Sequence, residues 1–130
     1  MTKERLAQLV HAARAVAARA HAPYSKFQVG AALLADDGNT YLGCNVENAS
    51  FGATVCAERS AVSAMVAAGG SKVLAVAVYT NATQPTFPCG VCRQVLSEFA
   101  QETVVIVAND SAQEQTTLAE LLPHAFVFES

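Results

Sequence analysis

The sequence predicts an α/β domain built around a mixed sheet, and three observations support this class. Two segments, 3–20 and 56–68, carry apolar side chains at the spacing of amphipathic helices. Two others, 73–79 and 103–108, are almost continuous apolar runs, which is typical of strands buried on both faces of a sheet. Helical and strand segments alternate along the chain, and this order stacks helices on a sheet in two or three layers.

The first part of the chain predicts a helix followed by a hairpin. Helix 3–20 ends in segment 21–25, because Pro23 cannot continue it. Segments 27–34 and 40–47 then have strand character, and the polar turn that joins them contains Gly38. These two strands form an antiparallel pair.

The second part predicts three further helices and two strands. In order, these are helix 56–68, strand 73–79, helix 89–100 (after a loop at 81–88), strand 103–108 and a short last helix. The Gly69-Gly70 pair is a good stop signal for the first of them. Thr117 and Glu120 have capping-box spacing and open the last helix, which Pro123 follows.

Length and composition limit the possible functions. The 130 residues predict a single domain, 1–130, and 52% hydrophobic residues against 15% charged ones predict buried subunit interfaces. A net charge of −3, with eight scattered Lys and Arg residues, argues against a nucleic-acid partner. The sequence has no apolar run of membrane-spanning length and no secretory signal, so a membrane partner is not expected. Four cysteines without an export signal favour the cytoplasm.

Three cysteines and one glutamate have the spacing of a catalytic zinc site. Cys56 precedes Glu58 by two residues, and Cys89 and Cys92 form a Cys-X-X-Cys pair about thirty residues later. A structural zinc ion has four protein ligands, whereas a catalytic one keeps three and leaves a position for water. The sequence therefore predicts Cys56, Cys89 and Cys92 as ligands and Glu58 as the proton carrier.

The three thiols also fall at predicted helix starts, where free N–H groups favour thiolates. Three thiolates and one Zn²⁺ sum to −1, a charge that opposes ionisation of a bound water. Helix dipoles offset part of this charge, and we expect Arg59 or Arg93 to offset more by donating to the sulfurs.

Two other interpretations of the cysteines remain. The Cys-X-X-Cys pair has the spacing of a redox dithiol, but that leaves the third cysteine and its neighbouring Glu unexplained. Cys44 would complete a four-cysteine structural zinc site, but it lies in a predicted strand, away from any helix start. We expect Cys44 to be a small buried apolar residue.

Asn45 and Glu47 form a second candidate group. Residues two apart on a strand point to the same side, so one amide and one carboxylate would project together and bracket sugar hydroxyls. Taken alone, the pair fits a solvated strand end better.

Six motifs, in order, make the chain resemble the small cytidine deaminases whose zinc is held by three cysteines. The resemblance runs from Ala22 to about Phe126. The motifs lie at 23–27, 29–32, 43–48, 56–59, 88–94 and 120–123.

This resemblance implies a three-layer α/β/α cytidine deaminase-like fold with helices on both faces of the sheet. It implies hydrolysis of cytidine and deoxycytidine to uridine and deoxyuridine with release of ammonia, a step of pyrimidine salvage. It further implies one zinc per subunit and a homotetramer whose active sites are completed across interfaces. The alternatives are a deaminase of a modified or antibiotic cytosine nucleoside and a noncatalytic zinc-stabilised interaction module.

The resemblance also assigns substrate contacts. Phe27 matches the aromatic residue that stacks on the pyrimidine, Asn45 and Glu47 match the ribose-binding pair, and Phe126 matches an aromatic from a neighbouring subunit. Ala57 is a further substrate contact. In the family, an arginine at the position of Arg59 contacts the cysteine ligands.

The sequence departs from the family pattern at three positions. Gln28 replaces a frequent Pro, Phe51 a common Tyr, and Phe87 a small residue beside the second cysteine motif. Phe87 is therefore expected to narrow the pocket.

The implied chemistry gives Glu58 several proton transfers. It takes a proton from the zinc-activated water, protonates ring N3 of cytosine and delivers a proton to the departing amino group. One carboxyl can do this near neutral pH if its pKa is raised, as in a pocket with little water.

Overall fold

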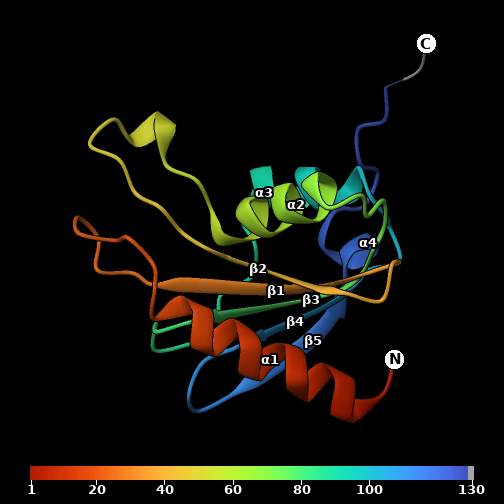
Figure 1. Cartoon of the computed structure of the whole chain (residues 1–130), viewed down its shortest axis with the longest axis horizontal. Helices are drawn as coiled ribbons and strands as arrows, with labels where there is room; N and C mark the ends of the chain where they lie inside the picture. Colours follow the sequence, from red (N-terminus) through yellow and green to blue (C-terminus); the bar gives the residue numbers. More distant parts are fainter. Residues whose placement is uncertain (129–130) are drawn as a thin grey trace.

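The computed structural model describes residues 1–128 and has a five-stranded mixed sheet as its centre (Figure 1). The spatial order of the strands is β2-β1-β3-β4-β5. The strands are β1 (Val29–Ala35), β2 (Thr40–Cys44), β3 (Val73–Thr80), β4 (Val104–Ala108) and β5 (Gln113–Thr117). Only the central β3–β4 pair is parallel; the other three pairs are antiparallel.

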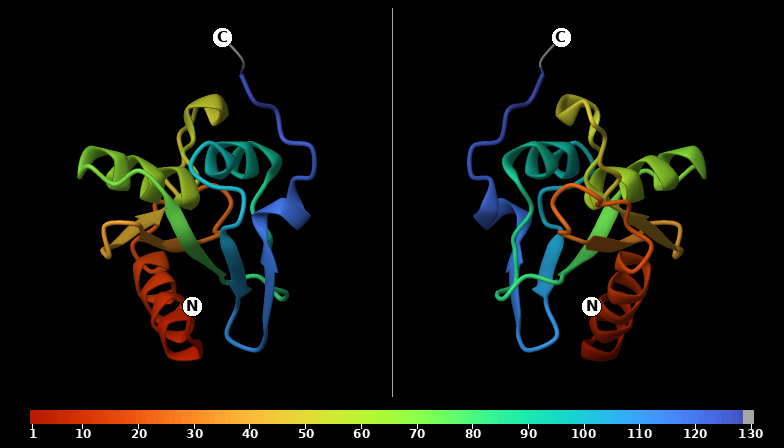
Figure 2. Two further views of the ribbon diagram at one scale, coloured as in Figure 1. Left: turned by 90° about the vertical axis from the view of Figure 1, so that its right-hand side faces the viewer. Right: turned by 90° about the vertical axis from the view of Figure 1, so that its left-hand side faces the viewer.

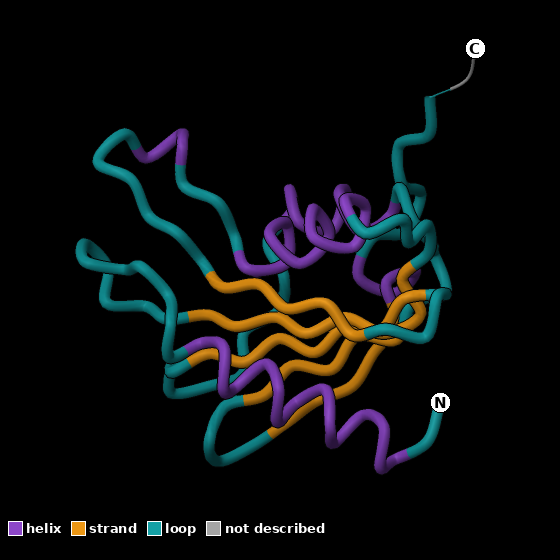
Figure 3. Tube along the Cα trace, in the orientation of Figure 1, coloured by secondary structure: helices purple, strands orange, loops and turns teal. Residues whose placement is uncertain are grey.

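Helices cover both faces of this sheet, which confirms the three-layer prediction (Figures 1 and 2). Helix α1 (Lys3–Ala17) lies alone on one face. The helices α2 (Ala57–Ala67), α3 (Gly90–Ser97) and the short α4 (Leu118–Leu121) lie on the other. A 3-10 turn, η1 (Phe51–Ala53), belongs to a loop that projects past the strand ends (Figure 3). No helix within residues 1–128 is long and apolar enough to cross a membrane.

The two faces of the sheet bury different side chains. Below α1 the strands present mostly small residues, among them Ala32, Ala75 and Ala77. The opposite face carries the larger Leu33, Val76 and other branched side chains against α2 and α3. Alternate residues of a strand point to opposite faces of the sheet. A strand that is covered on both faces therefore does not alternate apolar with polar residues, as the apolar runs predicted.

Four predicted boundaries are wrong by two residues or more. Strand β1 begins at Val29 and not at 27, and helix α3 ends at Ser97 and not at 100. Helix α1 ends at Ala17 and not at 20, because His21 and its neighbours turn to meet the β2 side of the domain: the His21 N–H donates to the Asn45 carbonyl at 3.0 Å. Strand β2 ends at Cys44 and not at 47, and beyond it only Val46 forms isolated bridges. The chain leaves the sheet at this point.

Strand β5 was not predicted. Its sequence, Gln-Glu-Gln-Thr-Thr, has no apolar residue, and it lies at the sheet edge with its first three side chains exposed. Its strand conformation comes from pairing with β4. The capping box that follows it is confirmed: the Thr117 hydroxyl accepts from the Glu120 N–H at 3.3 Å.

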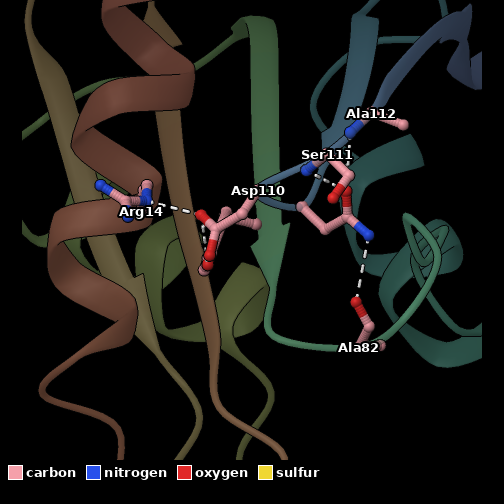
Figure 4. Close-up of polar contacts among 7 residues, drawn as sticks. Arg14, Ala82, Asp110, Ser111 and Ala112 are labelled. Carbon is pink, nitrogen blue, oxygen red and sulfur yellow. Dashed lines mark hydrogen bonds and ion pairs between the residues drawn. The ribbon is translucent and has the colours of Figure 1, made fainter.

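The turn between β4 and β5 fixes the loop that leads to the second cysteine motif (Figure 4). The side chain of Asn109 accepts from the N–H groups of Ser111 and Ala112, both at 2.8 Å, and donates to the carbonyl of Ala82 at 3.1 Å. Next to it, Arg14 donates to Asp110 at 2.8 Å. This turn therefore holds the start of segment 81–88 against the end of the sheet.

Gly43 sets how closely α2 approaches the sheet. A Cβ built on Gly43 would lie 2.3 Å from the carbonyl oxygen of Ala57 and 2.5 Å from the nitrogen of Ala61. Both are backbone atoms of the helix whose first turn carries Glu58, so neither can move without moving the helix. Close backbone contact here places the start of α2.

We expect Gly43→Ala to lower the free energy of unfolding by about 1–3 kcal/mol, because the helix must shift to admit the methyl group. The midpoint of thermal unfolding measures this change. Gly52→Ala is the matched control, since its added Cβ meets nothing within 4 Å. Equal midpoints for the two variants would contradict the close-packing argument.

Candidate active site

The three predicted zinc ligands lie at the starts of two helices. Cys56 is the N-cap residue of α2, Cys89 is the N-cap residue of α3, and Cys92 lies in the first turn of α3. The helices begin in regular geometry, since Ser60 donates to the Cys56 carbonyl at 3.0 Å and Arg93 to the Cys89 carbonyl at 2.9 Å. Because α2 and α3 pack side by side, their first turns meet.

The sulfur atoms of these three cysteines lie within 4.8 Å of one another. Zn–S bonds of about 2.3 Å in a tetrahedron separate the sulfurs by roughly 3.8 Å, so a small contraction would fit the cluster to zinc. Three soft thiol ligands suit this metal, and three leave a tetrahedral position open. Cys44 is not a member of this cluster; it is half-buried at the end of β2, less buried than we expected.

Hydrogen bonds within the cluster share its protons unequally. The thiol of Cys92 donates to the sulfur of Cys56. This hydrogen bond, a second one with Cys89 and the nearby charge of Arg59 together lower the pKa of Cys56 to about 6. The same bond raises the pKa of Cys92, and burial raises it further. Zinc must displace the retained protons, so zinc binding strengthens as pH rises.

Glu58 is buried in the first turn of α2, with a residue exposure of 5%. Burial raises its pKa to about 7, and the nearby charge of Cys56 contributes in the same direction. This is the shift that proton transfer near neutral pH requires.

The two arginines use backbone carbonyls as their main partners. Arg59 donates from one terminal nitrogen to the Thr54 carbonyl at 2.9 Å, and its buried Nε finds no partner within residues 1–128. Arg93 donates to the carbonyls of Pro88 at 2.7 Å and Leu121 at 2.8 Å. Arg93 thus ties the residue before Cys89 to α4, and no bond from it to a sulfur is found among the described residues.

A cavity of about 250 Å³ opens beside the cysteines. Its wall contains eight of the residues singled out in the sequence: Phe27, Asn45, Glu47, Cys56, Ala57, Glu58, Phe87 and Cys89. It also contains five others: Val29, Thr54, Val78, Thr80 and Thr86. Phe87 lies on the wall as expected from its position beside the cysteine motif.

Asn45 and Glu47 both reach this cavity, but not as a strand pair. The strand ends at Cys44, so their common direction comes from the irregular segment that follows. The Glu47 carboxylate accepts from the backbone N–H groups of Tyr24 at 3.0 Å and Ser25 at 3.2 Å. The Ser25 hydroxyl donates to it as well, and this bond, with the backbone bonds, lowers the pKa of Glu47 and keeps it ionised.

The side chain of Asn45 is buried and holds the segment that carries Phe27 and leads into β1. Its Nδ2 donates to the Phe27 carbonyl at 2.7 Å, and its Oδ1 accepts from the Val29 N–H at 2.9 Å. An amide has two donor hydrogens and two acceptor lone pairs, so one of each remains for a ligand.

Asn81 holds the other edge of the same segment. Its Oδ1 accepts from the Gln28 N–H, and its Nδ2 donates to the Lys26 carbonyl, both at 3.2 Å. Together, Asn45 and Asn81 bond consecutive backbone groups of 26–29 and fix the position of Phe27. Sequence analysis missed Asn81; its position directly after a buried strand was the available signal.

Two aromatic residues lie away from the cavity. Phe126 is 72% exposed, near the end of the described chain, and is not part of the cavity wall formed by residues 1–128. Phe51 is 77% exposed, and its ring packs edge-on against Tyr24 with centroids 6.3 Å apart.

Comparisons with known proteins find matches over most of the chain. Residues 3–108 match the family model of the cytidine and deoxycytidylate deaminase zinc-binding region. Cytidine deaminase of Sporosarcina psychrophila is 48% identical over 110 residues, which are 83% of this chain and 81% of that protein. Cytidine deaminase of Mycobacterium tuberculosis is 46% identical over 110 residues, which are 85% and 80% of the two chains.

Solved structures give the same result. The crystal structure of cytidine deaminase from Burkholderia pseudomallei superposes with a TM-score of 0.89 at 43% identity, covering 97% of this chain and 100% of that one. That of the Mycobacterium tuberculosis enzyme superposes with a TM-score of 0.83 at 40% identity, covering 98% and 100%.

Proposed function

We propose that this chain, which belongs to the cytidine and deoxycytidylate deaminase family, is a zinc-dependent hydrolase of cytidine and deoxycytidine. The products are uridine or deoxyuridine and ammonia. One observation carries this assignment: three clustered sulfurs and a buried carboxyl with a pKa raised to about 7 belong to one site. A purely structural zinc site would have no use for that carboxyl.

In this proposal Cys56, Cys89 and Cys92 hold one zinc ion per subunit. The metal supplies a Lewis acid that makes a water molecule acidic near neutral pH. Arg59 contributes positive charge next to Cys56, and Arg93 holds the Pro88 carbonyl and so the position of Cys89.

Glu58 moves the protons. As a carboxylate it accepts one from the attacking water, and it then delivers a proton to ring N3, which makes C4 more electrophilic. The remaining hydroxyl of the water adds to C4. Glu58 then takes the last proton from that hydroxyl and passes it to the amino group, so that the C4–N bond breaks, ammonia departs and a C4 carbonyl remains. Its burial excludes bulk water from these transfers.

Phe27, Ala57, Asn45 and Glu47 hold the nucleoside. Phe27 offers its ring to the pyrimidine, and its backbone is fixed by two asparagines. The free donor and acceptor of Asn45 and the ionised Glu47 suit ribose hydroxyls. All four residues line the same cavity, which supports this assignment.

The active enzyme in this proposal is a homotetramer, and each cavity is completed by Phe126 of a neighbouring subunit. Three observations support assembly. The cavity of about 250 Å³ is below the usual range for small-molecule sites, Phe126 is exposed, and Val127 and Phe128 beside it are exposed too.

A cluster of reduced thiols also favours a reducing compartment, and we assign the enzyme to the cytoplasm on that ground.

Glu47→Ala is expected to raise KM for cytidine about tenfold or more, because a charge-assisted hydrogen bond to the sugar is lost. Zinc content should stay at one per chain. Steady-state kinetics with metal analysis measures both quantities. An unchanged KM would remove Glu47 from the substrate contacts.

The proposed function is tested by the ultraviolet absorbance of cytidine mixed with the zinc-loaded protein. We expect loss of the cytosine band with one ammonia released per nucleoside, and a slower loss after a chelator strips the metal. No turnover by fully zinc-loaded protein would contradict the proposal. Activity confined to a modified cytosine nucleoside would retain the chemistry and change the substrate.

A further inference from the structure

Thr80 is part of the cavity wall and carries a buried hydroxyl without a partner within residues 1–128. It is the last residue of β3, is 1% exposed and lies directly across from Val29 of β1 in the strand register. Its side chain shares a sheet face with Val78, two residues earlier, and both reach the cavity. The Thr80 Oγ1 atom is buried and has no hydrogen-bond partner among residues 1–128.

Such a hydroxyl costs stability unless something satisfies it. A buried donor or acceptor without a partner lowers stability, and valine would fill the same space without that cost. Another buried threonine shows the usual arrangement: the Thr103 hydroxyl donates to the Val73 carbonyl at 2.8 Å. Thr80 has no such bond within residues 1–128, and a ligand in the cavity that Thr80 lines would supply one.

We infer that the Thr80 hydroxyl forms a hydrogen bond with the polar edge of the pyrimidine ring in the bound nucleoside. This inference rests on the proposed function and adds a substrate contact to it. The neighbours of Thr80 on the wall, Val29 and Val78, are apolar and suit a flat ring. Asn45 and Glu47 supply an amide and a carboxylate that suit the ribose hydroxyls. The base would then lie beside Thr80.

The test compares the zinc-loaded Thr80→Val and Thr80→Ser variants with the unaltered enzyme. Valine keeps the shape and removes the hydroxyl, whereas serine keeps the hydroxyl and removes a methyl group. We expect Thr80→Val to lower kcat/KM for cytidine about tenfold, the loss of one hydrogen bond to substrate. Thr80→Ser should stay within about threefold of the unaltered enzyme.

Thr103→Val is the matched control, because its hydroxyl is equally buried but already partnered within the protein. It should lower the midpoint of thermal unfolding by several degrees and leave kcat/KM unchanged. Thr80→Val should do the opposite: the midpoint stays the same or rises, while kcat/KM falls. A merely structural role for Thr80 cannot produce this crossed pattern.

Equal kcat/KM for Thr80→Val and the unaltered enzyme would overturn the inference and leave the proposed function intact. An equal loss in Thr80→Val and Thr80→Ser would overturn it as well, because serine keeps the hydroxyl and the loss would then follow any change of side-chain shape. If the unaltered, zinc-loaded protein turns over no cytosine nucleoside, the proposed function fails first and the inference with it.

Discussion

Replacing Glu58 by glutamine is expected to lower kcat for cytidine by about 10³-fold or more while one zinc ion per chain remains. The amide fits the same buried space but cannot accept a proton from water or return one to the leaving amino group. General acid and base catalysis by one group commonly contributes 10²–10⁴-fold, and Glu58 performs more than one such transfer. Kinetics and metal analysis on the same preparation check both statements.

Glu114→Gln is the control for this variant, since Glu114 is an exposed carboxylate on β5. It should leave kcat unchanged. A Glu58→Gln enzyme that retains more than a tenth of the activity would show that another group carries the protons.

The pH dependence follows from the raised pKa of Glu58. The reaction begins with the carboxylate, whose pKa of about 7 means that its fraction falls as pH drops through 7. At pH 5 about one carboxyl in a hundred is ionised, and kcat/KM should fall accordingly. The residual activity of Glu58→Gln should lack this step, which the pH profiles of the two enzymes test.

Cys92→Ser is expected to weaken zinc binding by at least about 100-fold and to abolish turnover. Removing a residue that only hydrogen-bonds to a metal ligand already lowers metal affinity 10–100-fold, and removing a direct ligand lowers it more. The chain has four cysteines, and the remaining one, Cys44, lies outside the cluster and does not take the place of Cys92. Zinc retained after dialysis against a graded chelator measures the change.

Cys44→Ser provides the matched comparison, because Cys44 is a free thiol outside the cluster. We expect it to keep its zinc and its activity. Zinc loss in this variant would revive the four-cysteine structural site and would count against the open metal position.

The sequence predicted the elements that bury apolar faces and the motifs that carry chemistry. The β3 and β4 runs were recognisable since strands buried on both faces need apolar side chains throughout. The three cysteines were recognisable because metal ligation constrains residue type and spacing at helix starts.

What the sequence did not predict depends on tertiary contacts. Strand β5 is polar and takes its conformation from pairing with the preceding strand β4, so it lacks the apolar pattern by which the other strands were recognised. The common direction of Asn45 and Glu47 comes from bonds to segment 24–29 and not from strand geometry. Thr80 ends the buried strand β3 and Asn81 follows it, and neither belongs to a motif. Only the fold shows that Thr80 lines the cavity and that Asn81 holds the segment of Phe27.

The polarity of β5 also affects how the molecule meets its copies. A strand at a sheet edge exposes unpaired backbone groups that can recruit a strand from another chain and start aggregation. Here the edge strand is five residues long and begins with exposed Gln and Glu side chains. Pairing with a strand of another chain is therefore disfavoured on that side. In the assembly proposed above, subunits would instead meet through side-chain surfaces, such as the exposed Phe126–Phe128 segment, where contacts can close into a finite oligomer.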